Sequence, residues 1–232
     1  MADQIMETIL LQHGPTPVQW RRSARARRIS LRIDPRAGGV VVTLPARAIE
    51  AAGRALVHNH AGWIGERLSR LPQPIAFVEG ADVPLGGDWF RIRHWPEGGA
   101  TRVDQGCLLV GGTPPALAQN VSDFMQDEAR RRLGAAAVRK ARNAGLCVRK
   151  VVVKDTRTRW GSCTADGALM FCWRLVMAPL LVQDYVVAHE VAHLRHMNHG
   201  AQFWALVEEL TPHREAGTEW LATRGGSLMR IG

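Results

Sequence analysis

The sequence predicts an α+β protein, in which an antiparallel β-rich N-terminal part is followed by a helix–strand–strand–helix part. Residues 29–33 alternate apolar and polar side chains with the period of two that strands show, and residues 40–44 form a β-branched run. After Pro115, apolar residues recur at helical spacing as far as about Asn143. A second helical stretch, which begins after Pro179, contains the motif H-E-x-x-H at residues 189–193.

The chain of 232 residues is long enough to bury the core of one large domain or of two smaller ones. The run GGTPP, at residues 111–115, is rich in turn formers, so we place a domain boundary there. Residues 1–113 then form a β-rich N-terminal domain and residues 114–232 a second domain. No apolar run reaches the ~20 residues of a membrane span. Residues 1–20 do not resemble a secretory signal, and we expect a cytoplasmic protein without membrane contact.

The first domain contains one predicted hairpin. Ile29, Leu31 and Ile33 alternate with polar residues, and residues 40–44 form a second β-branched run after a turn-rich segment. Residues 47–71 have apolar side chains three and four apart, which predicts a helix that Pro72 ends. Short segments between residues 77 and 112, broken by glycine and proline, predict an antiparallel meander.

The second domain begins with a long predicted helix that Gly145 ends. Residues 148–155 and 169–175 predict two strands, joined by a loop that carries Trp160. This loop could line a substrate cleft, or Trp160 could pack beneath it. The four cysteines show no C-x-x-C spacing, so we expect reduced and mostly buried thiols.

The net charge of +9 favours acidic partners only mildly. Up to Thr113 there are 14 basic and 10 acidic residues, and beyond it 16 and 11, so the charge is spread over both halves. The densest cationic run comprises Arg21, Arg22, Arg25, Arg27 and Arg28. It could contact a weak acidic or nucleic-acid partner. Because no aromatic residues alternate with these arginines, as stacking on bases requires, a solvated strand face is the simpler interpretation.

The motif H-E-x-x-H predicts a catalytic metal site. Residues four apart lie on one face of a helix, so His189 and His193 can bind the same ion. Zinc accepts imidazole nitrogens, and a catalytic zinc needs a third protein ligand and an open position for water. Glu190 can reach that water without binding the metal, which is the arrangement of a general base in hydrolysis.

His199 is the preferred third ligand. On a continuous helix it would be turned away from His189, so the helix must end and the chain fold back. Asn198 tolerates the left-handed conformation and Gly200 flanks it, which gives a physical cause for the break. His196 is the competitor, but a straight helix places it too far from His189. Downstream glutamates are a weaker third choice: Glu208, Glu209, Glu215 and Glu219.

Four motifs resemble the YgjP-like metallopeptidases, a family related to the SprT-like zinc proteases. They are RWGSC at 159–163, CWRLVMAP at 172–179, DYVVAHEVAHL at 184–194 and NHGAQFW at 198–204. The resemblance implies a zincin-like catalytic domain in which His189, His193 and His199 bind Zn²⁺ and Glu190 is the base. It assigns no role to Arg159, Trp160 or Cys163.

Three functions remain open from the sequence. The first is a zinc metallopeptidase that acts on a peptide or protein substrate through a zinc-bound water activated by Glu190. The second is a metal-dependent nucleoside triphosphate pyrophosphohydrolase whose arginines bind phosphates, although the sequence has no P-loop. The third is a nucleic-acid-associated module with a structural metal. Glu190 argues against the third, because a structural site requires no base. The oligomeric state is not predicted.

Overall fold

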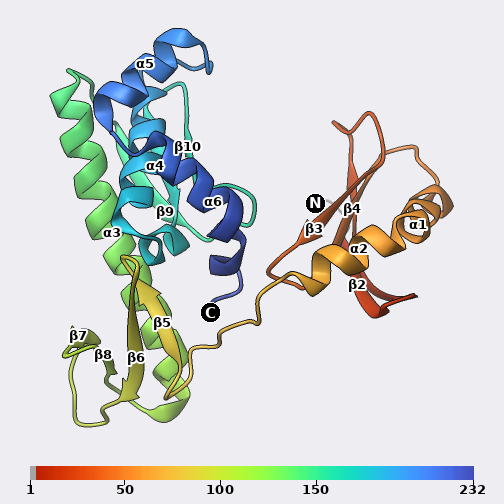
Figure 1. Ribbon diagram of the computed structural model, residues 1–232, viewed down its shortest axis with the longest axis horizontal. Coiled ribbons are helices and arrows are strands. Elements are labelled where there is room, and N and C mark those ends of the chain that lie inside the picture. Colours follow the sequence, from red (N-terminus) through yellow and green to blue (C-terminus); the bar gives the residue numbers. More distant parts are fainter. Residues whose placement is uncertain (1–3) are drawn as a thin grey trace. The chain divides into compact units, whose positions relative to one another are not determined.

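The computed structural model describes residues 4–232, which form a mixed α/β fold of two compact units (Figure 1). The N-terminal unit extends to Pro74, and the C-terminal unit runs from Ile75 to Gly232. Each unit has its own buried hydrophobic cluster. The elements that carry the H-E-x-x-H motif all belong to the C-terminal unit.

This division differs from the boundary expected after Thr113. The C-terminal unit also contains the strands that precede that residue, because their buried side chains share one core with the following helix. Val83, Ile92 and Leu108 belong to the same hydrophobic cluster as Met125 and Leu133. The run GGTPP is therefore a connection within a unit, where a 3-10 turn at Pro114–Ala116 leads into the long helix.

The N-terminal unit is a four-stranded sheet with two helices. The order is β1-β2-β4-β3, where β1 is Gln4–Leu11, β2 Gly14–Ser23, β3 Ser30–Asp34 and β4 Gly39–Pro45. The predicted hairpin is confirmed as the antiparallel pair β3–β4, whereas β2 and β4 are parallel. The single helix expected over residues 47–71 is two, α1 (Glu50–Asn59) and α2 (Ala61–Ser69). They separate at His60, whose backbone leaves the helical region.

A second four-stranded sheet opens the C-terminal unit. Its order is β5-β6-β8-β7, with β5 at Asp82–Leu85, β6 at Asp88–His94, β7 at Arg102–Asp104 and β8 at Cys107–Val110. The antiparallel meander expected here is wrong, because β6 and β8 are parallel. The loop after β6 carries β7 to the sheet edge, and β8 then pairs beside β6. Gly111 permits this path, since a Cβ there would lie 2.1 Å from the carbonyl oxygen of Gly99.

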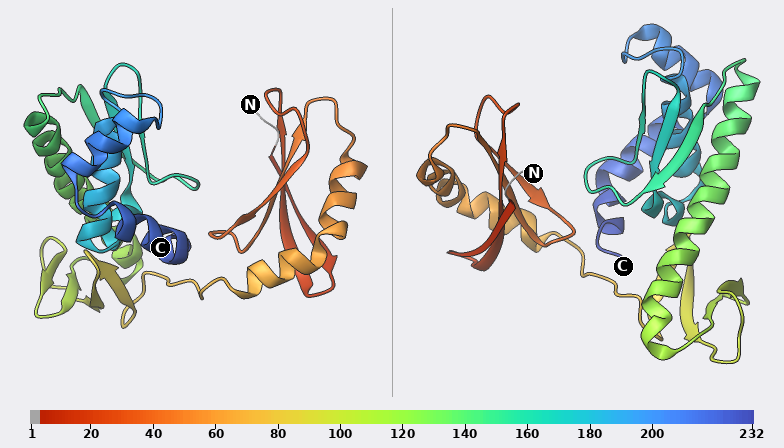
Figure 2. Two further views of the ribbon diagram at one scale, coloured as in Figure 1. Left: turned by 45° about the horizontal axis from the view of Figure 1, so that its top comes forward. Right: turned by 180° about the vertical axis from the view of Figure 1, so that it is seen from behind.

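The long helix α3 (Leu117–Asn143) is confirmed and organises the rest of the unit. Its apolar stripe is fully buried, from Val121 through Met125 and Ala129 to Leu133 and Ala137. It packs beside α4 (Leu180–Ala192) and against strand β9 (Figure 2). The remaining helices are α5 (Ala201–Leu210) and α6 (Arg214–Leu228).

A three-stranded sheet in the order β10-β11-β9 lies between α3 and the H-E-x-x-H helix in sequence. Both predicted strands are confirmed, as β9 (Lys150–Lys154) and β11 (Ala168–Cys172), and they are parallel. The segment expected as a loop adds a short strand, β10 (Gly161–Cys163), antiparallel to β11. After β11 the chain turns into a 3-10 helix (Trp173–Met177) rather than extending to residue 175 as a strand. β10 is thus an edge strand, and it contacts α4.

All four cysteines are free thiols, as expected, but only Cys172 is buried. Cys147 is exposed, whereas Cys107 and Cys163 are half-buried. Among the helices of residues 4–232, none is long and apolar enough to cross a membrane.

Candidate metal centre

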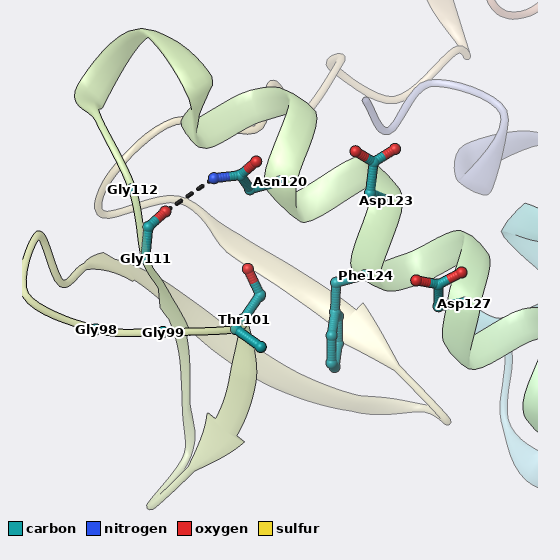
Figure 3. A pocket seen from close by; sticks show the side chains of 10 residues that line it. Gly98, Gly99, Thr101, Gly111, Gly112, Asn120, Asp123, Phe124 and Asp127 are labelled. Carbon is teal, nitrogen blue, oxygen red and sulfur yellow. Dashed lines mark hydrogen bonds between the residues drawn. The ribbon is translucent and has the colours of Figure 1, made fainter.

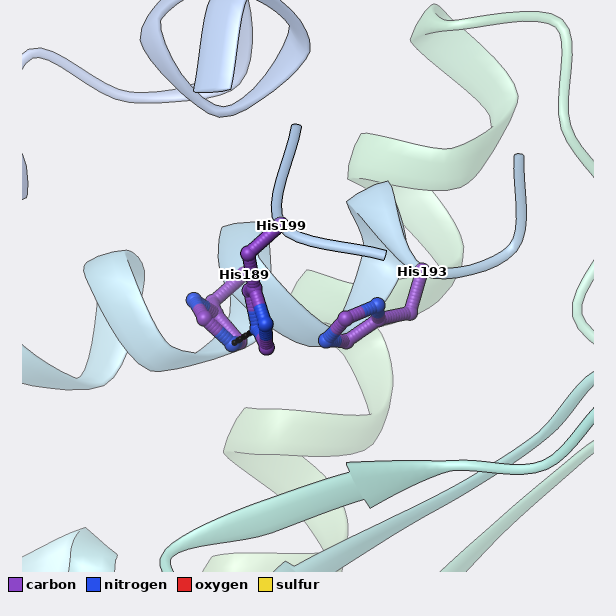
Figure 4. A group of neighbouring side chains, drawn as sticks. All are labelled: His189, His193 and His199. Atoms are coloured by element: carbon purple, nitrogen blue, oxygen red, sulfur yellow. Dashed lines mark hydrogen bonds between the residues drawn. The ribbon is translucent and has the colours of Figure 1, made fainter. Parts of the chain in front are cut away.

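Three imidazoles converge beside α4 (Figure 4). His189 lies in the last turn of α4, His193 caps its C-terminal end, and His199 comes from the segment that leads into α5. One ring nitrogen of each lies within 4.8 Å of those of the other two. The Nε2 atoms of His189 and His199 are 3.2 Å apart. No other set of histidine, cysteine or acidic side chains in residues 4–232 forms such a group.

The chain folds back as the spacing requires, but not for the expected reason. The helix ends at Ala192, several residues before the predicted break. Asn198 does not adopt a left-handed conformation, since the only non-glycine residue with positive φ in the described part of the chain is Gln105. Instead, the Asn198 side chain accepts a hydrogen bond from the backbone N–H of Gly200 at 3.3 Å. This local turn precedes α5 and orders the segment that carries His199.

His196 contributes its backbone and not its ring. Its carbonyl oxygen accepts a hydrogen bond of 3.0 Å from Nδ1 of His193. This contact fixes the tautomer of His193 and leaves its Nε2 free as a ligand atom. Neither the His196 ring nor any of the four downstream glutamates joins the three histidines. Glu208, for example, forms an ion pair with Arg214.

Aromatic side chains from α5 hold the exposed His199 ring in place. Trp204 stacks on it with 28° between the ring planes, and Phe203 meets it edge-on at 4.8 Å between ring centroids. The guanidinium of Arg214 lies 4.1 Å from the centroid of the Trp204 ring. The sequence predicted no role at the site for Phe203 and Trp204, although the NHGAQFW motif contains both. Their position four and five residues after His199, at the start of a helix, is the signal that could have revealed this role.

His189 and His193 are held as neutral imidazoles. Burial is the main cause that lowers the pKa of His189 to about 4, and His193 and His199 lower it further. Burial also lowers the pKa of His193, although its hydrogen bond to His196 opposes the shift. A neutral imidazole has the free lone pair that a metal ion requires.

Glu190 is 6% exposed and lies one position round the helix from His189. Burial raises the pKa of its carboxyl to about 7, and the positive charge of Arg159 partly opposes this. The buried Oε2 has no hydrogen-bond partner among the described residues. A carboxyl group that titrates near neutral pH and keeps a free oxygen has the properties of a general base.

Gly161 of β10 makes room for this carboxyl. A Cβ at residue 161 would lie 2.5 Å from both Cγ and Oε1 of Glu190, so no larger residue fits without displacing the carboxylate. The sequence analysis placed Gly161 in a loop and gave it no role. A glycine within a short strand often marks such a close approach, but the signal was hidden because β10 was not predicted as a strand.

The sequence comparisons agree with this geometry. A model of the YgjP-like family, described as a metallopeptidase domain, matches residues 27–224. The chain belongs to the YgjP-like family. No curated protein and no solved structure matches it. The match covers most of both units, so the YgjP-like domain includes the hairpin β3–β4 and the helices α1 and α2 as well as the three histidines.

In the RWGSC motif of the YgjP-like domain, some residues pack against the core and others lie near the site. Trp160 packs: it is half-buried against the core and lies close to Gly225 of α6. Cys163 remains a neutral thiol, because burial and the nearby Glu190 raise its pKa to about 11. It is not part of the histidine group. Tyr185, one turn before His189, packs against Gly217 and meets the His189 ring edge-on at 6.1 Å.

The residues present fit a metal ion. Three imidazole nitrogens lie within 4.8 Å of one another, and unpartnered buried polar atoms lie beside them, Nδ1 of His189 and Oε2 of Glu190. Three nitrogen ligands and a free carboxylate are the donor set of a catalytic rather than a closed structural zinc site. At the level of its family, the chain is a metal-dependent peptidase, and the three histidines could hold the metal ion.

A separate cavity of about 460 Å³ lies at the other end of the unit, where α3 meets the β6–β7 loop (Figure 3). Asn120 closes one side by donating a hydrogen bond of 2.8 Å to the carbonyl oxygen of Gly111. Its two carboxylates, Asp123 and Asp127, already bind Gln119 and Arg130. It contains no histidine or cysteine and has no part in the metal centre.

Proposed function

We propose that the chain is a zinc metallopeptidase in which His189, His193 and His199 bind one ion and Glu190 is the general base. The convergence of three imidazoles beside a buried carboxyl with a free oxygen carries this proposal. Three nitrogen ligands favour zinc over magnesium or calcium, which prefer oxygen ligands.

A bound zinc ion would polarise the scissile carbonyl and lower the pKa of a water molecule. The chain's own residues then handle the proton. Glu190 accepts it from the attacking water at Oε2 and delivers it to the leaving amine. Burial supports both steps, because a carboxyl with a pKa near 7 can hold and release a proton at neutral pH.

The edge strand β10 supports a peptide as substrate. It pairs only with β11, so the described chain leaves its other side without a strand partner. An extended peptide could pair with that side and pass beside Glu190, which Gly161 of the same strand approaches. A nucleoside triphosphate would instead need clustered phosphate ligands, and only Arg159 is implicated near Glu190 by its charge. Nothing in the structure favours that alternative, or a structural metal.

The test compares the wild-type chain with Glu190→Gln. Both are loaded with zinc and offered an unfolded protein and a panel of nucleoside triphosphates. Glutamine cannot accept the proton but keeps the shape, so the variant should retain zinc and lose proteolysis by about 10²–10⁴-fold.

Elemental analysis of both proteins is the control, since an equal zinc content shows that the loss is chemical. Nucleotide turnover that disappears in Glu190→Gln, without proteolysis by the wild type, would replace the peptidase with the pyrophosphohydrolase. Full proteolysis by Glu190→Gln would remove Glu190 as the base.

A further inference from the structure

The N-terminal unit has an open edge strand of its own. β3 pairs only with β4 and ends the sheet order β1-β2-β4-β3. Beside it lies a cavity of about 440 Å³, which we call the β3 groove. The start of β3 forms one side, and the end of α1 with the start of α2 forms the other. A strand edge flanked by a helix is a geometry in which extended peptides bind by adding a strand.

The side chains that line the β3 groove suit a ligand that has an apolar group with negative charges beside it. Ile29, Leu31 and Leu56 are apolar, and Trp63 is 40% exposed although it is large and hydrophobic. The polar residues that line it are Arg28, Ser30 and His60, and none is acidic. On the helix side, the guanidinium of Arg67 lies 5.9 Å from the Trp63 ring centroid.

Unpaired cations lie in the loop that leads to one end of the β3 groove. Arg25, Arg27 and Arg28 lie in the exposed loop that leads into β3. None of the three has an ion pair or a hydrogen bond among the described residues. Arg22 differs, because it donates hydrogen bonds to the carbonyl oxygens of Ala46 and Ala48 at 3.2 and 2.9 Å. It therefore supports the fold, whereas the loop arginines are free to bind a partner.

Charge is concentrated in this unit once the structural boundary is used. Up to Pro74 the sequence has 11 basic and 5 acidic residues, a net charge of +6. From Ile75 onward it has 19 and 16, a net charge of +3 in a unit about twice as long. The charge is evenly spread only when the sequence is divided at Thr113, which lies inside the C-terminal unit. The N-terminal unit therefore has the higher density of positive charge and attracts an acidic partner more strongly than the C-terminal unit does.

We propose that the β3 groove binds an extended acidic segment of a polypeptide, which adds to β3 as a fifth strand. Its main chain pairs with the free side of β3, an apolar side chain rests on Trp63, and its carboxylates meet Arg25, Arg28 and Arg67. A peptide fits better than a nucleic acid, because Trp63 is the single aromatic residue of the groove and its floor is aliphatic. The inference goes beyond the proposed peptidase, and binding here does not require the metal centre.

The test measures binding of a fluorescein-labelled peptide of alternating valine and glutamate by fluorescence anisotropy. The protein is the full chain with Glu190→Gln, so that the probe is not cleaved. Two altered peptides accompany it, one with lysine at each glutamate and one with N-methylated alternate amides. Each should bind at least about tenfold more weakly, because the first reverses the charge and the second removes backbone hydrogen bonds.

Protein variants locate the site. Arg25→Glu with Arg28→Glu, and separately Trp63→Ala, should each weaken binding about tenfold. The matched control is Arg36→Glu with Arg70→Glu, which changes the charge equally at the far ends of β3 and α2 and should change affinity less than about twofold. The N-methylated peptide tests for strand addition, which β10 could also offer, so the protein variants decide which edge is used. Circular dichroism shows that each variant is folded, and either the arginine pair or Trp63→Ala suffices if the other variant fails to fold.

Equal binding of the N-methylated or the lysine peptide would overturn the proposal. So would preferential binding of single-stranded DNA that Arg25→Glu with Arg28→Glu abolishes, or self-association of the chain that Trp63→Ala abolishes. Failure of the peptidase proposal would look different: the peptide would bind through the groove, but the wild type would cleave no polypeptide.

Discussion

Two sets of ionisable groups, one in each unit, differ in how far water reaches them. In the N-terminal unit, Arg54 binds Glu7 and Glu50, but all three side chains are roughly one-third to two-fifths exposed. In the C-terminal unit, Arg174 is 1% exposed and Glu190 6%. Water screens the exposed charges of Arg54 and its partners, so their interactions are weak. Interactions of the buried Arg174 and Glu190 are stronger, because little water reaches them.

The difference separates binding from chemistry. Exposed cations can attract a partner from a distance. Buried groups have shifted pKa values, as His189 and Glu190 show, and such shifts tend to mark catalytic sites. The proposed metal centre therefore lies in the unit with the buried groups, and the proposed β3 groove lies in the unit with the exposed cations. Three measurements sharpen this contrast, and they follow from the largest expected effect to the smallest.

Arg174 and Arg54 test the contrast directly. Arg174 binds Asp155 and also donates to the carbonyl oxygen of Ile231 at 3.2 Å, so it ties the C-terminal end of the chain to the core. Arg174→Ala should lower the free energy of unfolding by about 3–5 kcal/mol, because it empties the space of a large buried side chain and leaves the carbonyl oxygen of Ile231 unpaired. Arg54→Ala, the matched control, should change it only marginally. Urea denaturation of both variants checks this, and equal losses would contradict the contrast.

Glu190 should destabilise the metal-free protein as pH rises. Its folded pKa of about 7 lies above the value of 4.5 expected when the chain is unfolded, so the unfolded state loses its proton first. Stability is therefore lost between pH 4.5 and pH 7, by about 3 kcal/mol at 1.36 kcal/mol per pKa unit. His189 acts in the opposite direction, because its lowered pKa costs stability as pH falls from 6.5 towards 4.

Comparison with Glu190→Gln in the presence of a chelator isolates the carboxyl, since His189 is common to both proteins. The variant should gain about 3 kcal/mol over the wild type between pH 4.5 and pH 8. A difference in unfolding free energy that does not change with pH would show that Glu190 is not desolvated.

Gly161→Ala should reduce peptide hydrolysis about tenfold while zinc remains bound. The added Cβ would lie 2.5 Å from Glu190 and must displace its carboxylate, and small displacements of catalytic groups are costly. Gly226→Ala is the control, because a Cβ there meets nothing within 4 Å. Assays of kcat and zinc content distinguish the two, and unchanged turnover in Gly161→Ala would mean that the carboxylate tolerates the shift.

The sequence predicted the features that depend on local periodicity. The hairpin of residues 29–44, the long helix α3 and the H-E-x-x-H helix all follow from the spacing of apolar residues. The three histidines were also identified, because the helix geometry of His189 and His193 requires the chain to fold back before a third ligand.

Features set by contacts between distant residues were not predicted. The parallel pairs β2–β4 and β6–β8 depend on which strands meet, and no local pattern encodes that choice. The unit boundary at Pro74 depends on the packing of β5–β8 against α3, whereas GGTPP indicated only a turn. The room that Gly161 leaves for Glu190 is likewise a contact across 29 positions of the sequence.

The metal ligands are the central claim, and zinc binding by His199→Ala and His196→Ala tests them most directly. The chelator-treated proteins are titrated with zinc against a competing chromophoric chelator. His196→Ala keeps the backbone carbonyl that orients His193, so it should bind one zinc ion per chain with unchanged affinity. His199→Ala removes a ligand and should bind zinc at least about 100-fold more weakly. Equal zinc affinity in the wild type and His199→Ala would contradict the assignment.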